Sequence, residues 1–172
     1  MRHTLSVVIV VLILPTATLA QAAPSPATVN QIVSFNPFGI VLNWANVEFE
    51  RKVGEAVTVG GSASHFPYFE QSNAALLVRW YPERKALEGV YLGARVGAYA
   101  FKNYDSYFEF LERTTVMPGA GVEIGRNWLL GPGNQIAIGV GFGLTRILGG
   151  GHSYDVPSVL PGFRLVNVGI AF

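Results

Sequence analysis

The stretch QIAIGVGFGL, residues 135–144, alternates strictly between two kinds of side chain. Its even-numbered residues, from Ile136 to Leu144, are large and apolar, whereas the odd-numbered ones are Gln135, Ala137 and three glycines. Successive side chains of a β-strand point to opposite faces, so this period of two predicts a strand with one bulky face and one small face. A soluble sheet instead places charged residues opposite its apolar face. An apolar outside and a crowded inside of small residues are typical of a narrow β-barrel in a membrane.

The same alternation recurs along most of the chain and predicts about eight strands. Each segment is close to the 9–11 residues that a tilted strand needs to cross a membrane. Both ends of such a barrel lie on the same side of the membrane, so the strand number is even. We therefore predict an all-β, antiparallel up-and-down transmembrane β-barrel. Its strands are expected at residues 27–36, 39–51, 56–66, 74–81, 89–101, 115–126, 134–146 and 162–172.

The connections between these segments form two alternating sets. The longer set, which contains the two longest connections, is residues 67–73, 102–113 and 149–161. The shorter set is residues 52–55, 82–88 and 127–133, and none of these is longer than 67–73. Because outer-membrane barrels have short periplasmic turns and long extracellular loops, we expect the longer set outside the cell at every step. The first strand, within 27–36, has the weakest alternation of the eight.

The composition fits one domain of this kind. The chain has 172 residues, of which 50% are hydrophobic and only 13% charged, and it contains 20 glycines. Soluble globular domains usually carry about 25% charged residues. Because the chain has no cysteine, disulfides and thiolate metal sites are excluded. The formal net charge of +1 offers no basic surface for nucleic acid, and we expect no cofactor and no metal ion.

Residues 1–22 have the pattern of a cleavable secretory signal peptide. Arg2 and His3 form a short basic start, and an apolar run over 5–14 ends at Pro15. A helix of that length spans about 15 Å, which is too short for a bilayer core of about 30 Å. Cleavage after Ala22 would leave residues 23–172 as the barrel domain, or 172 − 22 = 150 residues.

The C-terminus is the most specific feature of the sequence. Apolar residues alternate back from the last residue of the chain, namely Val166, Val168, Ile170 and Phe172. This ending resembles the C-terminal assembly signal of bacterial outer-membrane proteins. The stretches NVEFER (46–51), RWYP (79–82) and LEGVYLG (87–93) are similar to an uncharacterised family of small eight-stranded outer-membrane barrels, of the OmpX and OmpA-barrel type.

The resemblance implies a location and partners, but no activity. It implies the outer membrane of a Gram-negative-type bacterium, reached after export and cleavage of the signal peptide. The implied partners are the lipids of that membrane and the barrel assembly machinery, which would bind the C-terminal strand. The sequence identifies no ligand for the surface loops.

Five charged residues fall on the face predicted to point inward: Glu48, Glu50, Arg79, Arg95 and Glu123. Side chains fill an eight-stranded barrel, and buried charges persist only when they are paired and hydrogen-bonded. We therefore predict an ion-pair network in which the two arginines bridge the three glutamates and brace the interior. A proton or ion pathway, or a buried catalytic carboxylate, remains an alternative.

Loop residues provide the types needed for acyl chemistry. In serine hydrolysis a histidine takes the serine proton and a carboxylate orients the histidine. The first candidate set is His65, Asp105 and Ser106, and the second is His152, Ser153 and Asp155. Polar residues in loops more commonly form solvated turns, so we predict no enzymatic activity. Lipid A acyl transfer or deacylation at the outer leaflet is the alternative function.

Aromatic residues gather near the predicted periplasmic rim, where membrane barrels carry an aromatic girdle: Trp80, Tyr81, Tyr91 and Trp128. Taken together, the sequence predicts an integral outer-membrane barrel with a filled interior and a structural or surface-interaction role. A large pore is not expected, because open channels need about twice as many strands. A secreted lipocalin-like barrel that binds an apolar ligand is a second alternative, and it requires large apolar residues inside.

Overall fold

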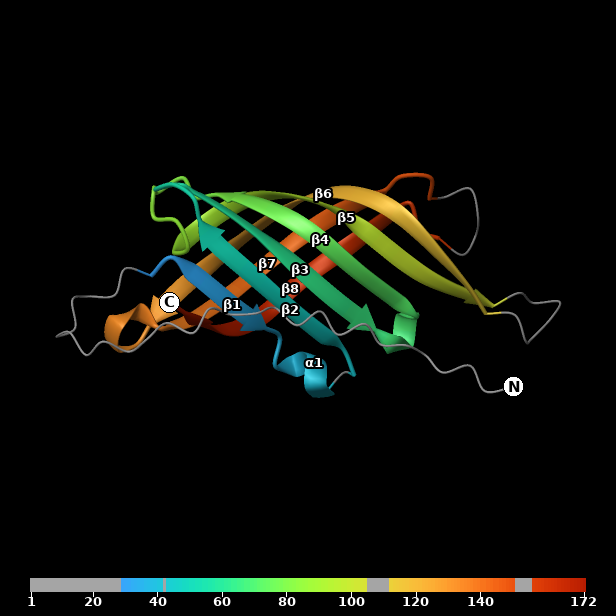
Figure 1. The fold of residues 1–172 in the computed structure, drawn as a ribbon, viewed down its shortest axis with the longest axis horizontal. Helices are drawn as coiled ribbons and strands as arrows, with labels where there is room; N and C mark the ends of the chain where they lie inside the picture. The colour runs from blue at the N-terminus through green and yellow to red at the C-terminus, as the bar shows by residue number, and fades with distance from the viewer. Residues whose placement is uncertain (1–28, 42, 105–111, 151–155) are drawn as a thin grey trace, which may run out of the picture.

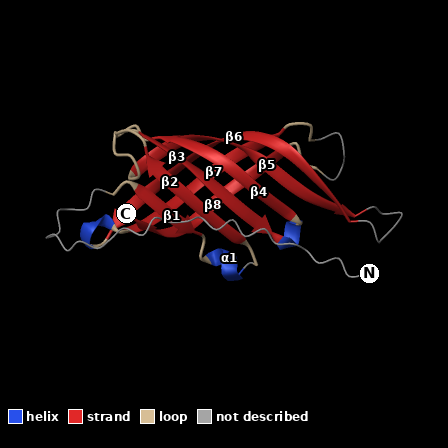
Figure 2. Ribbon diagram, in the orientation of Figure 1, coloured by secondary structure: helices blue, strands red, loops and turns tan. Residues whose placement is uncertain are grey.

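The protein forms a closed β-barrel in a computed structural model that describes residues 29–41, 43–104, 112–150 and 156–172. Each strand pairs antiparallel with the next along the chain, and the first pairs with the last (Figures 1 and 2). The predicted all-β, eight-stranded up-and-down architecture is therefore confirmed. The proposed signal peptide, residues 1–22, lies outside the described residues. The strands are β1 (Gln31–Phe35), β2 (Ala45–Lys52), β3 (Val57–Phe66), β4 (Gln71–Trp80), β5 (Gly89–Tyr104), β6 (Glu112–Leu130), β7 (Ile136–Ile147) and β8 (Val159–Ala171).

The period of two in the sequence becomes two faces of the barrel wall. On β7, Ile136, Phe142 and Leu144 are exposed on the outside, whereas Ala137 and Thr145 are buried. On β2, Glu48 and Glu50 are buried, although they alternate with exposed apolar residues. The interior is therefore partly polar and the exterior largely apolar.

Among the described residues, three short helical turns lie between strands: α1 (Phe38–Val41), η1 (Pro67–Phe69) and η2 (Pro132–Asn134). In the described part of the chain, no helix has the length and apolar character needed to cross a membrane. The predicted strand 39–51 is wrong at its start, because α1 takes its first residues. The Oδ1 atom of Asn36 accepts the Phe38 N–H at 3.0 Å, and the ring of Pro37 presets a helical φ.

The connections at the two ends of the barrel differ less in length than predicted. The β3–β4 connection is only residues 67–70, because β4 begins at Gln71, and it is shorter than the connection 81–88 at the opposite end. Glu70 adopts a left-handed φ of 49°, which lets the chain reverse directly after η1. The expectation of longer loops on the outer side at every step is therefore wrong here.

Strands β5 and β6 are longer than predicted. They remain paired from Gly89 with Asn127 to Tyr104 with Glu112, and they extend beyond the rest of the wall at one end (Figure 1). At the other end β6 reaches Leu130, so Asn127 belongs to a strand and not to the predicted turn 127–133.

The line where the barrel closes is short. β1 is the shortest strand and meets β8 over four pairs, from Ile32 with Ala171 to Phe35 with Val168. The carbonyl of Phe172 accepts hydrogen bonds from the backbone N–H groups of Asn30 (2.9 Å) and Gln31 (2.8 Å). Beyond Phe35 no described strand lies between β8 and β2.

Apolar residues pack at both ends of the interior. At the end that holds the C-terminus, the buried cluster is Ile32, Leu87, Ala137 and Ala171. At the other end, the cluster is Tyr99, Phe101, Ile147 and Val156. The polar residues of the interior lie between these two clusters and form the candidate site.

Candidate functional site: a buried polar network

Arg79 of β4 lies at the centre of the polar interior, and its side chain has no exposed surface. Its Nη1 and Nη2 atoms donate to the two carboxylate oxygens of Glu48 at 2.8 and 3.0 Å. Nη1 also donates to Oε2 of Glu50 at 2.5 Å, and Nε donates to Oε1 of Glu123 at 2.6 Å. One guanidinium therefore joins carboxylates from β2 and β6, and it also lies 4.4 Å from the ring centre of Tyr91.

Uncharged side chains donate further hydrogen bonds to the carboxylate of Glu50. Thr58 donates its hydroxyl to Oε1 at 2.5 Å, and Tyr81 donates its phenol to the same oxygen at 2.6 Å. Asn127 donates its amide to the Tyr81 oxygen at 2.9 Å. Buried carboxylates are costly unless their oxygens accept hydrogen bonds, and these donors meet that need.

Arg164 of β8 is a member that sequence reasoning missed. Its Nη2 atom lies 2.9 Å from Oε1 of Glu48, and Nη1 donates to Oδ1 of Asn127 at 2.6 Å. Counting back from Phe172 with a strict period of two places Arg164 on the outer, apolar face. The observed inward position reflects a β-bulge, because Gly139 pairs with Asn167 whereas Gly141 pairs with Arg164.

The bulge places two residues of β8, Leu165 and Val166, opposite one residue of β7. It reverses the side to which the preceding residues of β8 point. The only signal in the sequence was the cost of an arginine on a face predicted to contact lipid. The bulge also interrupts the alternation of the predicted assembly signal. Ile170 and Phe172 are exposed on the outside, but Val166 lies within the bulge.

Arg95 of β5 is at the edge of the network. Its Nη2 atom lies 3.0 Å from Oε2 of Glu123, and its side chain remains 19% exposed. The structure thus brings together all five predicted charges, together with Arg164. Three guanidiniums face three carboxylates, so the fully ionised network carries no net charge.

Every carboxylate oxygen of the network accepts at least one hydrogen bond or ion pair. A general base must be within reach of a substrate, whereas Glu48 and Glu50 are almost fully buried and hydrogen-bonded within the network. The arrangement therefore favours bracing of the interior over catalysis by a buried carboxylate.

Glycines make room for these large side chains. A Cβ atom added to Gly93 would lie 2.7 Å from Cγ of Glu123. One added to Gly139 would lie 2.5 Å from both Nη1 of Arg164 and Oδ1 of Asn127. The small residues of the inward face thus leave the space that the charged side chains occupy.

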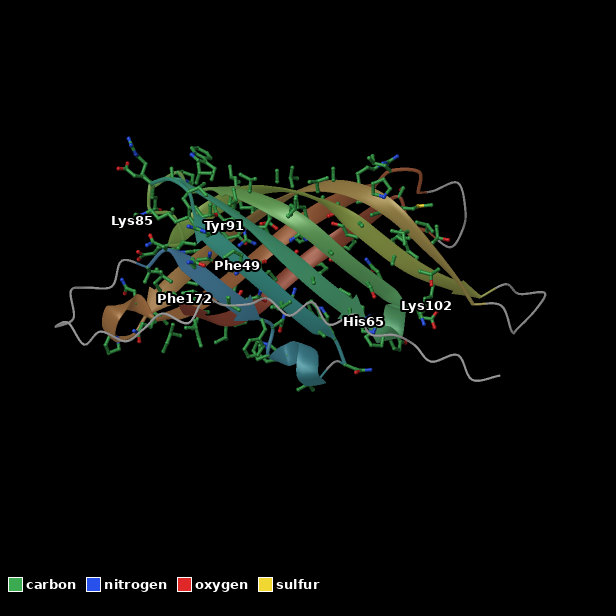
Figure 3. The ribbon with its side chains drawn as sticks, viewed as in Figure 1. Phe49, His65, Lys85, Tyr91, Lys102 and Phe172 are labelled. Carbon is green, nitrogen blue, oxygen red and sulfur yellow. The ribbon has the colours of Figure 1, made fainter. Side chains whose placement is uncertain are left out.

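Two of the four predicted interface aromatics lie elsewhere. Trp80 and Trp128 are 50% and 36% exposed on the outside of the wall. Tyr81 and Tyr91 are buried inside the barrel, where Figure 3 labels Tyr91, and their hydroxyls bond to network residues. Both tyrosines occupy odd-numbered positions, which point inward in this part of the wall. The prediction that they belong to the aromatic girdle is therefore wrong.

The described residues contain only one member of the proposed catalytic sets, His65. His65 lies at the rim near η1, as Figure 3 shows, with Nδ1 2.8 Å from Oγ of Ser72 on β4. The other candidates, Asp105, Ser106, His152, Ser153 and Asp155, lie outside the described residues. Among the described residues, no group of three His, Cys, Asp or Glu side chains could hold a metal ion.

Comparisons with known proteins concern the architecture around this network. No family model matches the sequence, and no curated protein matches it. The chain is similar in fold to the N-terminal β-barrel domain of Pseudomonas aeruginosa OprF. The TM-score is 0.57 at 11% sequence identity, over 84% of this chain and 96% of the OprF domain. The resemblance to small eight-stranded barrels is confirmed at the level of fold, and the OprF barrel adds no residue-level assignment.

Proposed function

We propose that this protein is an integral outer-membrane β-barrel with a closed interior, and that it serves as a structural or surface-interaction scaffold. The outer surface supports this proposal most strongly, because every strand contributes exposed apolar side chains to it. One example from each strand is Val33, Phe49, Val59, Leu76, Leu92, Val122, Phe142 and Phe163. Soluble proteins rarely expose such continuous apolar surface, whereas a bilayer requires it.

The same distribution opposes a secreted lipocalin-like barrel. That alternative requires large apolar residues inside and polar residues outside. The observed faces are the reverse, with Glu50 and Arg79 buried and Leu76 and Val78 exposed. We therefore do not favour the lipocalin-like alternative.

The interior supports a closed barrel and not a large pore. Arg79, Tyr81 and Leu87 are fully buried, so solvent does not reach the middle of the network or the apolar cluster below it. An eight-stranded barrel is only wide enough for its side chains to fill. We accordingly propose neither bulk conduction nor a catalytic step for this protein.

Orientation and partners follow from the same proposal. Both termini of such barrels lie in the periplasm, so the β5–β6 ribbon would extend outside the cell. The C-terminal strand, with Ile170 and Phe172 exposed on its outer face, would present the surface bound by the assembly machinery. Outer-membrane lipids would contact the apolar wall.

Cell fractionation combined with gel mobility before and after heating tests the proposal. We expect the protein in the outer-membrane fraction, with a folded band that shifts when the sample is boiled. Reconstituted protein in a planar bilayer should show no large, stable conductance steps. Recovery in the soluble periplasm without a heat-dependent shift would overturn the membrane location, and steady large currents would overturn the closed interior.

A further inference from the structure

Two hollows meet at Trp44 and Asn46, at the outer end of the barrel. The inner hollow, with a volume of about 430 Å³, lies inside the barrel above Glu48, Arg95 and Glu123. The outer hollow, also about 430 Å³, is bordered by Gly39 of α1 and by the start of β2. Its remaining lining residues are Phe35, Asn36, Gly39, Asn43, Ala45, His65 and Pro67. Trp44 and Asn46 line both hollows.

Among the described residues, no strand continues the barrel wall at this place. β1 ends at Phe35, which pairs with Val47 on one side and Val168 on the other. Further out, β2 continues to Ala45 and β8 continues to Val159, with no described strand between them. The segment that follows β1 instead carries α1 to the side of the wall (Figure 1).

A free strand edge in a membrane needs partners for its backbone groups. Unpaired N–H and C=O groups are tolerated at membrane depth only beside protein, water or another polar group. The edge of β8 that faces this gap contributes Leu160 and Gly162 to the lining of the inner hollow. An occupant with acceptor oxygens would satisfy the N–H groups of this edge.

Three side-chain atoms at the meeting point have no hydrogen-bond partner among the residues that the structure describes: Nδ2 of Asn36, Nε1 of Trp44 and Oδ1 of Asn46. Asn36 is only 3% exposed and lines the outer hollow. The first two atoms are donors and the third is an acceptor. Ester carbonyl and phosphate oxygens accept hydrogen bonds from such donors, and both occur where a lipid headgroup joins its acyl chains.

We infer that the gap between β8 and β2 is a binding site for one lipid molecule of the outer leaflet. Its phosphate or ester oxygens accept hydrogen bonds from Asn36 and Trp44, and an acyl chain lies outside along Phe35. This inference rests on the proposed membrane location. The neighbouring α1 supports an acyl chain over a water-soluble ligand, because its Phe38 and Val41 are exposed and its Gly39 lines the outer hollow.

Tryptophan fluorescence provides a direct test, because Trp44 lines the site. A variant with Trp80→Phe and Trp128→Phe keeps Trp44 as its reporter. A variant with Trp44→Phe and Trp128→Phe keeps Trp80, which is exposed on the outer wall. Both are reconstituted in vesicles of phosphatidylcholine whose acyl chains are brominated near their carbonyl ends, since bromine quenches tryptophan on close approach.

We expect the brominated lipid to quench both reporters. Ala45→Phe places a ring in the outer hollow and should restore most of the lost Trp44 emission. Ala63→Phe adds the same ring to the outer face of β3, away from the lining of either hollow, and should leave the quenching unchanged. Quenching of Trp80 should be the same in all backgrounds.

Three results would overturn the inference. Trp44 emission that resists brominated lipid but falls with aqueous acrylamide means that the hollows hold water only. Trp44 quenching that Ala45→Phe leaves unchanged means that the lipid is not in the outer hollow. If Trp80 itself escapes quenching, the membrane location fails and the lipid site fails with it, whereas quenched Trp80 beside protected Trp44 rejects the site alone.

Discussion

Nη2 of Arg164 on β8 lies 2.9 Å from Oε1 of Glu48 on β2, so one ion pair joins the two strands that flank β1. Backbone pairing between β1 and β8 is limited to four residue pairs. The barrel is therefore closed twice along this line, once through the backbone of its wall and once through its interior. The stability of the closed state should depend on side chains that the outer surface does not reveal.

Arg79→Met should be the most damaging single substitution in the network. It leaves Glu48, Glu50 and Glu123 without their shared cation, and removing one partner of a buried ion pair costs about 3–5 kcal/mol. Urea unfolding in lipid vesicles, followed by tryptophan emission, measures the loss. Arg84→Met is the control, because its pair with Glu55 is exposed and contributes about 0–1 kcal/mol. Equal stability of the two variants would contradict the bracing role.

Glu48→Gln and Arg164→Met should be strongly coupled. Each single change leaves a buried charge with fewer partners, whereas the double change removes both charges. A double-mutant cycle on the free energy of unfolding should give a coupling of about 0.5–3 kcal/mol. Additive effects, with no coupling beyond error, would show that the pair does not stabilise the closed barrel.

Deleting Val166 should prevent assembly of the folded barrel. The deletion removes the bulge, so Arg164 would turn toward the lipid, where an arginine at the bilayer midplane costs about 2–4 kcal/mol. The fraction of protein with heat-modifiable gel mobility reports the outcome. Val166→Ala keeps the chain length and should assemble normally. A deletion variant that folds as well as Val166→Ala would mean that the bulge does not determine the position of Arg164.

Gly93→Ala should destabilise the barrel by about 1–3 kcal/mol, since overpacking a filled interior forces its neighbours to move. The new Cβ atom would lie 2.7 Å from Cγ of Glu123 and 3.2 Å from Cγ of Arg79. Gly61→Ala is the matched control on β3, because its Cβ atom would meet only a carbonyl oxygen at an ordinary 3.6 Å. The two urea midpoints should differ, and identical midpoints would show spare room inside.

Alternation with period two was sufficient to predict the strands and most of the inward charges. It works because each β-strand residue points to one side of the wall, whatever its distant partners are. The same rule fails at Arg164, because a single extra residue reverses the alternation. Register depends on pairing with the neighbouring strand, which the sequence of β8 does not contain.

The start of β2 shows a second limit of the pattern. Val41, Ala45 and Val47 continue an apparent alternation, yet Val41 lies in α1. A local hydrogen bond, from the Phe38 backbone to the Asn36 side chain, favours a helical turn over a strand at this point. The hydrogen bonds among Tyr81, Asn127 and Glu50 were equally hidden, because they join residues that lie on different strands and far apart in sequence.

If the barrel inserts into a membrane, as proposed, the charge balance of the network has a consequence for the order of insertion. The six charges of the network are divided unequally among the four successive hairpins. The β1–β2 hairpin carries −2, from Glu48 and Glu50, and the β3–β4 hairpin carries +1, from Arg79. The charges of Arg95 and Glu123 cancel in β5–β6, and β7–β8 carries +1, from Arg164. Three of the four hairpins would each carry an unbalanced charge into hydrocarbon if they inserted alone. The sum becomes zero only when all four meet, so the network favours concerted insertion of a nearly closed barrel over insertion one hairpin at a time.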